Sequence, residues 1–497
     1  MPNGFAYLML FAWPLVSLAL FRMLPVHKAL IWTMLGGYLV LPSATGVKLP
    51  MIPMLDKNSI PALSALVFCQ LYAPATPGQT RSRPWTKERM VIVGLLVLLV
   101  GSPFLTVLAN SEPLNFGPRY LPALRLYDAF SMISGAAISI LPFLLAWRYL
   151  DTPEAHREIL RAFAFGGLAC SLPAMIEVRL SPQLHTWIYG FFPHDFIQHI
   201  RAGGFRPILF LSHGLMVGIF FCLSILAALM LWREARREGR PGTGWLCAAL
   251  WLTITLVLVK SVGALAISLM LGLVAGFAGR RLQVAAAAIV AAMVLLYPTL
   301  RGAGLIPVDR VYDMALSVSV ERAQSLKFRL DNEDGLLARA NEKPVSGWGG
   351  WGRNRIYDPE TGRDVSVTDG VWIIVIGVYG WLGYIAHFGL LTLPILLYAL
   401  QRRRFGPSLI TPGLLLLLSA VLIDFLPNAG LVPYVWMMAG ALAGFVMRPV
   451  GAAGEAIGDT SPDRRPAEAA TSWVMRETGD LPGRRPRGTA GRRHGDD

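Results

Sequence analysis

The chain alternates long apolar stretches with short polar connections along most of its length. A helix needs about 20 mostly apolar residues to cross the hydrocarbon core of a membrane. Eight clear stretches lie at 90–109, 129–149, 208–232, 263–279, 282–299, 380–400, 407–425 and 429–447. Five weaker stretches lie at 4–21, 30–47, 59–73, 159–176 and 244–260. This pattern predicts an all-α fold, a polytopic integral membrane bundle of about 12–13 transmembrane helices.

Basic residues gather in every second connection between the predicted helices. They are Arg81, Arg83, Lys87, Arg89, Arg148, Arg157, Arg161, Arg233, Arg236, Arg237, Arg240, Arg280, Arg281 and Arg402–Arg404. Cytoplasmic connections of membrane proteins carry an excess of Lys and Arg. We therefore expect these segments to be cytoplasmic. The remaining connections then face outward, and two of them, 177–207 and the long periplasmic loop 300–369, are large enough to build a site.

The composition supports a membrane protein, with 54% hydrophobic and only 15% charged residues, whereas soluble domains carry roughly 25% charged residues. The net charge of +14 is explained by the basic connections, so we expect no nucleic-acid partner. The four cysteines lie inside predicted helices, and no CxxC or HExxH spacing occurs. We expect no disulfide, no cofactor and no bound metal.

Two parts of the chain are expected. Residues 1–447 form the transmembrane domain. The remainder, 448–497, is rich in Gly, Pro, Ala and Arg with mixed charge. Such a segment cannot bury a core, so it predicts a disordered cytoplasmic tail.

The outer segment 177–207 concentrates histidines, arginines and aromatic residues. One interpretation is an aromatic belt at the membrane interface, anchored by arginines. The other is an anion-binding surface, because the forked guanidinium groups of Arg201 and Arg206 match phosphate oxygens. Gly203 and Gly204 would let the backbone bend around such a ligand.

Lys260 lies between two apolar stretches. It either extends to the interface or faces the same outer cavity as Arg201 and Arg206. His387 and Asp424 are polar residues within predicted helices. Each is either functional or part of a hydrogen bond between packed helices.

The long loop has a helical part and a glycine-rich part. Residues 313–330 predict an amphipathic helix, with Leu316, Val320, Ala323, Leu326 and Leu330 forming one apolar stripe. Arg322 and Arg329 lie beside the stripe, at a depth that suits lipid head groups.

The glycine-rich part of the loop runs from Pro344 to Arg355 as PVSGWGGWGRNR. Trp348 and Trp351 offer flat faces that stack on sugars or anchor at an interface. Arg353 and Arg355 follow them. The loop ends in Thr368-Asp369-Gly370, immediately before the next apolar stretch. The GWGGWG run lacks both the strand context of a dinucleotide fingerprint and the GK[ST] of a phosphate loop.

These segments, in this order, resemble the bacterial O-antigen ligase and O-antigen polymerase superfamily. The resemblance covers roughly residues 120–445. It is carried by RAGGFRP at 201–207, KSVGA at 260–264, PVSGWGG at 344–350, and TDGVWII with the later GVYGWLG after it.

The resemblance implies a glycosyltransferase of the bacterial inner (cytoplasmic) membrane that uses neither a nucleotide sugar nor a metal. Its donor would be a glycan on undecaprenyl diphosphate, and its further partners membrane lipids and a chain-length regulator protein. Either Arg201 or Arg206 matches the arginine of the family's outer loop. Lys260 stands where family ligases have the arginine of a Ser-Arg-Gly turn. Asp369 stands where ligases have a histidine, which favours the polymerase branch.

The residues themselves suit such chemistry. Breaking a sugar–diphosphate bond needs cations for the leaving group and a base for the attacking hydroxyl. Arg201, Arg206 and Lys260 are expected to hold the diphosphate, and the Trp348–Arg355 segment to seat sugars. Asp369 is the expected base; the alternatives are a helix cap or an ion pair with Arg353 or Arg355.

Other functions stay open at this point. An O-antigen ligase would transfer the glycan to lipid A-core or another acceptor. A polysaccharide transporter or flippase would place charges near mid-membrane in two similar halves. A non-catalytic assembly subunit is the third alternative.

Overall fold

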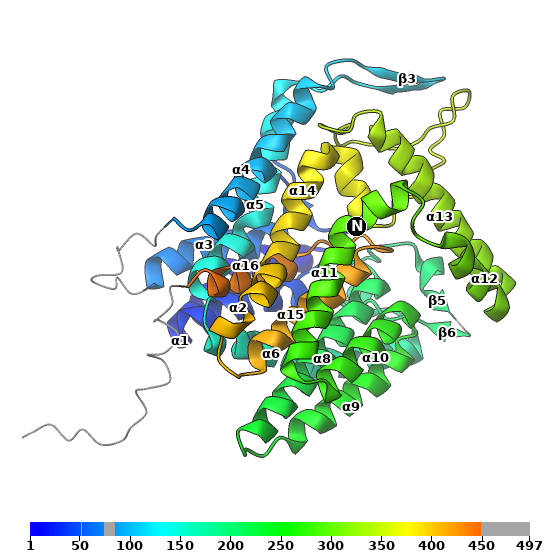
Figure 1. Ribbon diagram of the computed structural model, residues 1–497. Helices are drawn as coiled ribbons and strands as arrows, with labels where there is room; N and C mark the ends of the chain where they lie inside the picture. Colours follow the sequence, from blue (N-terminus) through cyan, green and yellow to red (C-terminus); the bar gives the residue numbers. More distant parts are fainter. Residues whose placement is uncertain (51, 74–84, 202, 449–497) are drawn as a thin grey trace, which may run out of the picture. The chain divides into compact units, whose positions relative to one another are not determined.

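The structure is a computed structural model that describes residues 1–50, 52–73, 85–201 and 203–448. The chain divides into a unit Met1–Val450 and a unit Gly451–Asp497. Residues 449–497 lie outside the described residues, so only Arg448 of the predicted tail 448–497 is described. Everything below concerns the first unit, drawn in Figure 1.

Each of the predicted apolar stretches coincides with an α-helix. The helices are α1 (Gly4–Met23), α2 (Val26–Val40), α3 (Ser59–Tyr72), α4 (Lys87–Leu108), α5 (Leu126–Tyr149), α6 (Pro153–Leu180), α8 (Gly214–Arg237), α9 (Thr243–Leu258), α10 (Val262–Phe277), α11 (Arg280–Gly302), α14 (Val371–Leu400), α15 (Ile410–Asp424) and α16 (Pro433–Val446). Within the described residues, seven of these are long and apolar enough to cross a membrane: α1, α4, α5, α6, α8, α11 and α14. The protein is therefore a helical membrane protein; the count of 12–13 spans stays a prediction.

The connections carry the remaining elements. Further helices are α7 (Leu184–Tyr189), η1 (Phe196–His199), α12 (Val308–Val318), α13 (Val320–Asn341) and η2 (Arg402–Arg404). Three antiparallel hairpins are β1 (Gly46–Val47) with β2 (Leu55–Asp56), β3 (Leu114–Phe116) with β4 (Arg119–Leu121), and β5 (Ile200–Arg201) with β6 (Gly204–Phe205).

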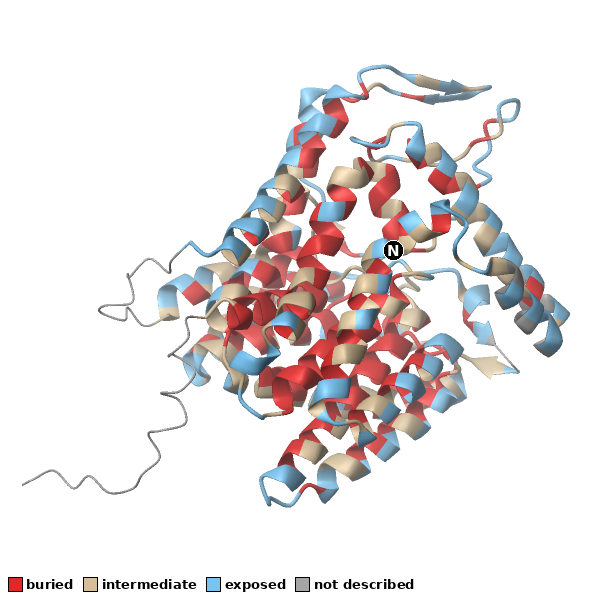
Figure 2. Cartoon of the chain, in the orientation of Figure 1, coloured by how far each residue is buried: buried red, intermediate tan, exposed pale blue. Residues whose placement is uncertain are grey.

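Helix α8 forms the centre of the bundle. Nearly nine-tenths of the residues in its most apolar stretch are buried. The helix packs against α6, α9, α10 and α15. Helices α8, α15 and α16 are buried along most of their length, and Figure 2 shows the buried residues, in red, concentrated in the middle of the bundle. Small residues allow close packing between helices: a side chain on Gly167 would collide with Ser224, and one on Gly440 with the backbone of Phe143.

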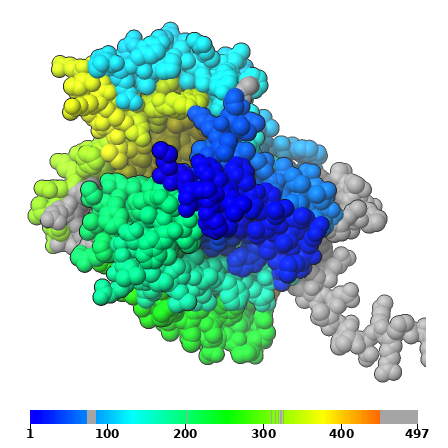
Figure 3. Space-filling model, turned by 180° about the vertical axis from the view of Figure 1, so that it is seen from behind, coloured from blue at the N-terminus to red at the C-terminus, as the bar shows by residue number. Residues whose placement is uncertain are grey.

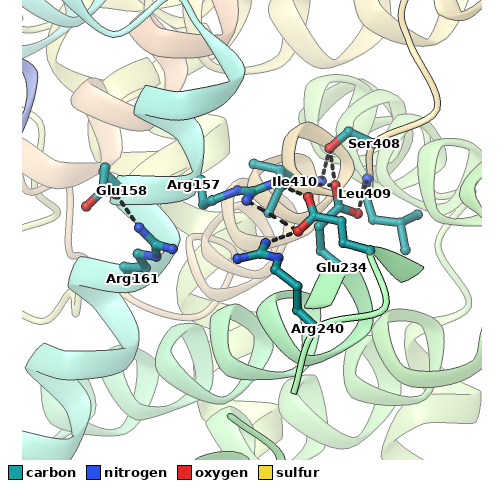
Figure 4. Close-up of polar contacts among 9 residues, drawn as sticks. Arg157, Glu158, Arg161, Glu234, Arg240, Ser408, Leu409 and Ile410 are labelled. Atoms are coloured by element: carbon teal, nitrogen blue, oxygen red, sulfur yellow. Dashed lines mark hydrogen bonds and ion pairs between the residues drawn. The ribbon is translucent and has the colours of Figure 1, made fainter. Parts of the chain in front are cut away.

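The predicted cytoplasmic connections lie together at one end of the bundle. Figure 4 shows the centre of this end, where Glu234 of α8 accepts hydrogen bonds from Ser408 Oγ (2.7 Å) and Leu409 N (3.0 Å). Arg157 of α6 lies 3.7 Å from the same carboxylate and 2.5 Å from Glu238. Five basic segments also meet through contacts such as Gln401–Glu88, Arg280–Arg402 and Arg448–Asp151.

The predicted outer connections meet at the other end. Asn3 N donates to Tyr189 O at 3.0 Å, and Figure 3 shows the N-terminal segment, in dark blue, against the green-cyan segment near residue 190. Lys57 Nζ donates to Phe210 O at 2.7 Å. The alternation of basic and non-basic connections thus separates the two ends of the bundle, as the positive-inside pattern requires.

Helix α14 is broken inside its apolar run, at Gly380 (φ 68°, ψ −169°). Trp381 N donates to Pro344 O (2.7 Å), while Gly377 O and Val378 O accept from Trp348 N (2.8 Å) and Gly349 N (2.9 Å). The glycine-rich segment 344–349 therefore satisfies the backbone groups that the break exposes, as buried backbone groups require. A side chain on Gly347 would lie 2.5 Å from Gly380 N, so only glycine fits there.

One expected element is different in the structure. The single helix predicted over 313–330 is two helices, α12 and α13, separated at Ser319, whose backbone is extended (φ −166°, ψ 134°). The helical stripe is therefore interrupted. Leu316 and Val320 are exposed, whereas Ala323 is buried. Helix α13 continues eleven residues beyond the predicted end, and packs on α14.

Candidate functional site

A buried glutamate organises the outer segment after α6. Glu177 is fully buried, and its carboxylate accepts hydrogen bonds from Leu184 N (3.0 Å), Ile208 N (2.8 Å) and Leu209 N (2.8 Å). Three amides on one carboxylate fix both ends of the segment 184–209 against α6. The β5–β6 hairpin is held between these two anchored ends.

Arg206 and Lys260 are brought together beside this hairpin. Arg206 is buried, and its Nη2 donates to Lys260 O at 3.2 Å. Its side chain occupies the space where a side chain on Gly214 would lie, at the start of α8. Lys260 reaches back to the hairpin, since its Nζ fills the space beside Gly204. The predicted third cation, Arg201, is in β5, but its side chain lies outside the described residues.

Three histidines converge beside Arg206. His194 precedes η1, His199 ends η1, and His213 is the N-cap of α8. One nitrogen from each ring lies within 4.8 Å of the other two. Arg206 N donates to His199 O at 2.8 Å, so the histidines and Arg206 share one backbone framework. Among the described residues, this group could hold a metal ion.

A second polar cluster lies where α11 ends against α13. Arg301 of α11 contacts Asp334 at 2.9 Å and Glu333 at 4.0 Å. Tyr297 Oη donates to Glu333 Oε2 at 3.2 Å. Burial raises the pKa of the Glu333 carboxyl to about 7, and the charges of Asp334 and Asp369 act in the same direction. Glu333 is therefore a partly buried carboxyl whose pKa lies near neutral pH.

Asp369 belongs to the same cluster. Its Oδ2 lies 3.4 Å from Arg329 Nε of α13, and both side chains are partly exposed. The N-cap of α14 is Gly370, with no side-chain cap. The capping interpretation of Asp369 is therefore wrong, and the predicted pairing with Arg353 or Arg355 is replaced by pairing with Arg329. The side chain of Arg322, the other arginine predicted on this helix, lies outside the described residues.

Trp348 and Arg353 lie inside the protein. Trp348 is 6% exposed, the guanidinium of Arg339 covers its ring at 3.3 Å, and its Nε1 donates to Arg339 O at 2.7 Å. Arg353 is 2% exposed and donates to Pro122 O (2.7 Å) and Glu112 O (2.9 Å). Both side chains hold the glycine-rich segment in place, and their polar groups are occupied by protein atoms.

Trp351 and Arg355 remain at the surface. Trp351 is 55% exposed and lines a cavity of about 210 Å³ together with Arg353, Asp128 and the segment 121–124. Arg355 forms an ion pair with Asp364, with 2.5 Å between Nη1 and Oδ2. Of the two tryptophans, Trp351 is the one whose ring is available to a ligand.

The α15–α16 turn contacts residues that neighbour both clusters in the sequence. Val371 N, two residues after Asp369, donates to Phe425 O (3.0 Å) and Asn428 O (3.2 Å). At Gly430 a side chain would lie 2.6 Å from Met216, in the first turn of α8 after His213. A residue close to Asp369 in the sequence and a residue close to His213 therefore contact the same short turn.

The two polar residues noted inside helices make local contacts. His387 Nδ1 lies 2.8 Å from Gly383 O, one turn earlier in α14. Asp424 accepts a hydrogen bond from Asn428 at 2.7 Å. Both contacts are local to one helix or its end and do not join two packed helices, and neither residue belongs to the clusters described above.

Sequence reasoning missed Glu177 and Glu333. Glu177 carried a signal, because it is a lone acid in the apolar run AMIEVRL. Glu333 carried none, since DNEDG reads as an exposed polar stretch and only the packing of α13 on α11 buries it.

The fold and the polar clusters define a class: a polytopic helical membrane protein with a polar site at one end of its bundle. A scan against protein-family models finds no match to this chain, and a search of curated proteins finds no similar sequence.

Proposed function

We propose that this protein is a membrane glycosyltransferase that polymerises oligosaccharide repeat units carried on undecaprenyl diphosphate. It would act at the periplasmic face of the bacterial inner membrane. One observation carries the proposal: a cation pair, Arg206 with Lys260, and a carboxylate pair, Glu333 with Asp369, lie in predicted outer connections whose neighbouring residues contact the same α15–α16 turn. Lipid-linked glycan transfer needs this combination of cations and carboxylates.

In the proposed reaction, an acceptor hydroxyl attacks the anomeric carbon of the donor. A new C–O bond forms, and the bond from that carbon to the diphosphate oxygen breaks. Its electron pair leaves with undecaprenyl diphosphate, whose charge Arg206, Lys260 and Arg201 stabilise. The hydroxyl proton passes to the carboxylate pair.

The two carboxylates contribute different properties to that base. Glu333 has a pKa near 7, which suits proton transfer at neutral pH. Asp369 is the more accessible, with its side chain 35% exposed beside Arg329. Asp369 therefore accepts the proton from the hydroxyl. Glu333 is the less accessible carboxyl of the pair, and its pKa lies near neutral pH.

Further partners follow from the surfaces. Trp351 and its cavity would seat a sugar ring by stacking. At the opposite end, a cavity of about 300 Å³ is lined by Arg280, Arg281, Arg402 and Arg403. Such basic cavities at a cytoplasmic surface bind anionic lipid head groups. A chain-length regulator protein is the proposed protein partner.

A gene deletion tests the function. Surface glycan is separated on a gel and lipid-linked repeats are extracted from the same cells. Glycan reduced to one repeat supports the polymerase. Loss of all repeats from the lipid core instead indicates an O-antigen ligase. Accumulation of repeats at the cytoplasmic face indicates a flippase and contradicts the proposal.

A further inference from the structure

Three histidines from separate parts of one outer segment meet at a single point. The ring centroids are 4.7 Å apart for His194 and His213, 4.9 Å for His199 and His213, and 5.7 Å for His194 and His199. Their nearest suitable nitrogens all lie within 4.8 Å of one another. Four of the chain's eight histidines lie between residues 185 and 213, and the fold brings three of these four together.

The fold holds the three rings on independent supports. His199 is buried at the end of η1, and the ring of Phe192 packs on it edge-on, 5.6 Å between centroids. His213 caps α8 and is partly buried, whereas His194 is exposed. The group therefore runs from the interior to the surface, with His194 on the solvent side.

The geometry is close to that of a coordinated metal. A tetrahedral site with metal–nitrogen bonds of about 2.0–2.1 Å places its ligand nitrogens roughly 3.4 Å apart. The rings would have to close by at most about 1.4 Å, which side-chain rotation supplies.

The ligand type selects the metal. Imidazole nitrogens suit zinc and its first-row neighbours, whereas magnesium and calcium prefer oxygen. The adjacent carboxylate, Asp195, accepts a hydrogen bond from Ile197 N. Three protein ligands leave a fourth position open. The nearby Arg206 and Lys260 favour an anion, such as hydroxide or phosphate, in that position.

His213 cannot cap α8 and bind a metal at the same time. Its Nδ1 accepts a hydrogen bond from Leu215 N at 3.0 Å. A metal on Nδ1 would use the same lone pair. A metal on Nε2 would require the ring proton on Nδ1, which would also end the acceptance. Metal binding therefore exchanges this cap for a coordinate bond.

We propose that His194, His199 and His213 form a transition-metal site of the zinc class, with an open fourth position beside Arg206. The argument for this metal site does not depend on the proposed glycosyl transfer.

The test uses the full-length protein in detergent, purified through a tag that contains no histidine. Metal content after dialysis against Zn²⁺ is measured by mass spectrometry, and Co²⁺ is titrated with visible absorption as the readout. We expect about one zinc per chain and the intense d–d band of tetrahedral Co²⁺. His194→Ala and His213→Asn should each weaken metal affinity more than about tenfold.

The variants separate coordination from folding. His213→Asn retains a good N-cap residue while removing the imidazole, and His194 is exposed, so neither change should alter the melting profile of the metal-free protein. His27→Ala removes a histidine outside the group and should leave metal binding unchanged. Metal content that is equal in wild type, His194→Ala and His213→Asn would overturn the proposal, as would wild-type protein that takes up no metal.

Discussion

Arg329 Nε lies 3.4 Å from Asp369 Oδ2, and this ion pair joins helix α13 to the residue before the N-cap of α14. Both side chains are partly exposed, so the pair contributes at most about 1 kcal/mol to stability. We expect Asp369→Asn to give a folded, membrane-inserted protein that makes little or no polymer. Chain length is read on a gel of the surface glycan.

The matched control for that variant is Asp364→Asn. Asp364 forms a similar ion pair with Arg355 in the same loop, but it lies outside the proposed carboxylate pair. The Asp364→Asn variant should polymerise the glycan normally. Polymerisation by Asp369→Asn at the wild-type rate would show that Asp369 serves only to hold Arg329.

Glu333 predicts a pH dependence. Its pKa is raised to about 7 in the folded protein by burial, so its ionised, proton-accepting form increases as pH rises through about 7. Polymerisation by purified protein should rise over the same range. Glu333→Gln should lower the rate and remove this step. An unchanged profile in the variant would exclude Glu333 from the base.

The same shift has an opposite effect on stability. A carboxyl with a raised folded pKa stabilises the fold fully below its unfolded pKa, near 4.5, and this contribution is lost as pH rises through about 7. Wild-type protein should therefore lose more stability than Glu333→Gln as the pH rises from 5 to 8. Thermal unfolding in detergent measures the difference.

Arg206→Lys tests the diphosphate clamp. Lysine keeps the charge but loses the planar fork that binds phosphate through two hydrogen bonds, so polymerisation should fall more than about tenfold, mainly through a raised KM for the lipid-linked donor. Arg179→Lys, at an exposed arginine near the end of α6, is the control and should change neither KM nor kcat. Normal kinetics in Arg206→Lys would show that Arg206 does not bind the diphosphate and only holds the turn at Lys260.

The two tryptophans should respond differently to truncation. Trp348→Ala removes a buried ring and its contact with Arg339, which should destabilise the protein by about 3–5 kcal/mol. Trp351→Ala removes an exposed ring and should change stability little while weakening binding of the donor sugar. Thermal melting and donor KM separate the two effects. Equal destabilisation by both variants would contradict the assignment of Trp351 to ligand binding.

The orientation in the membrane is testable with single cysteines in a cysteine-free background. Val365 and Arg403 are both exposed, at opposite ends of the bundle. In cells with a permeabilised outer membrane, an impermeant thiol reagent should label Val365→Cys and spare Arg403→Cys. Labelling of Arg403→Cys alone would invert the topology and remove the basis for a periplasmic reaction.

The helices could be predicted from the sequence because burial in a membrane needs only a sufficient apolar run. The errors lie at the ends of those runs. The run 208–232 begins at 214 as a helix because Glu177 takes the amides of Ile208 and Leu209. The run 30–47 ends at Val40 because Pro42 disfavours a helical conformation at the residue before it.

The site was less predictable, because its members come from distant segments. Arg206 and Lys260 could be grouped from their charge and their outer position. The approach of Glu333 to Asp369 and of His213 to His199 depends on how α13 and α8 pack, and no local pattern encodes it. Trp348 was mispredicted in the opposite direction. Its glycine-rich, aromatic segment is typical of a ligand-binding loop, but the Trp348 side chain is buried and packs inside the protein.

The break in α14 determines where a peptide tag can be inserted into this protein without disrupting the fold. Residues 344–349 supply backbone partners to amides and carbonyls within an apolar helix, so an inserted epitope there would leave those groups unpaired in a nonpolar environment. The tip of the Tyr357–Asp364 hairpin makes no such contribution, and its residues at 359–361 are exposed. A tag or fluorophore placed at the hairpin tip should therefore be tolerated, whereas the same tag ten to fifteen residues earlier should prevent assembly of the bundle.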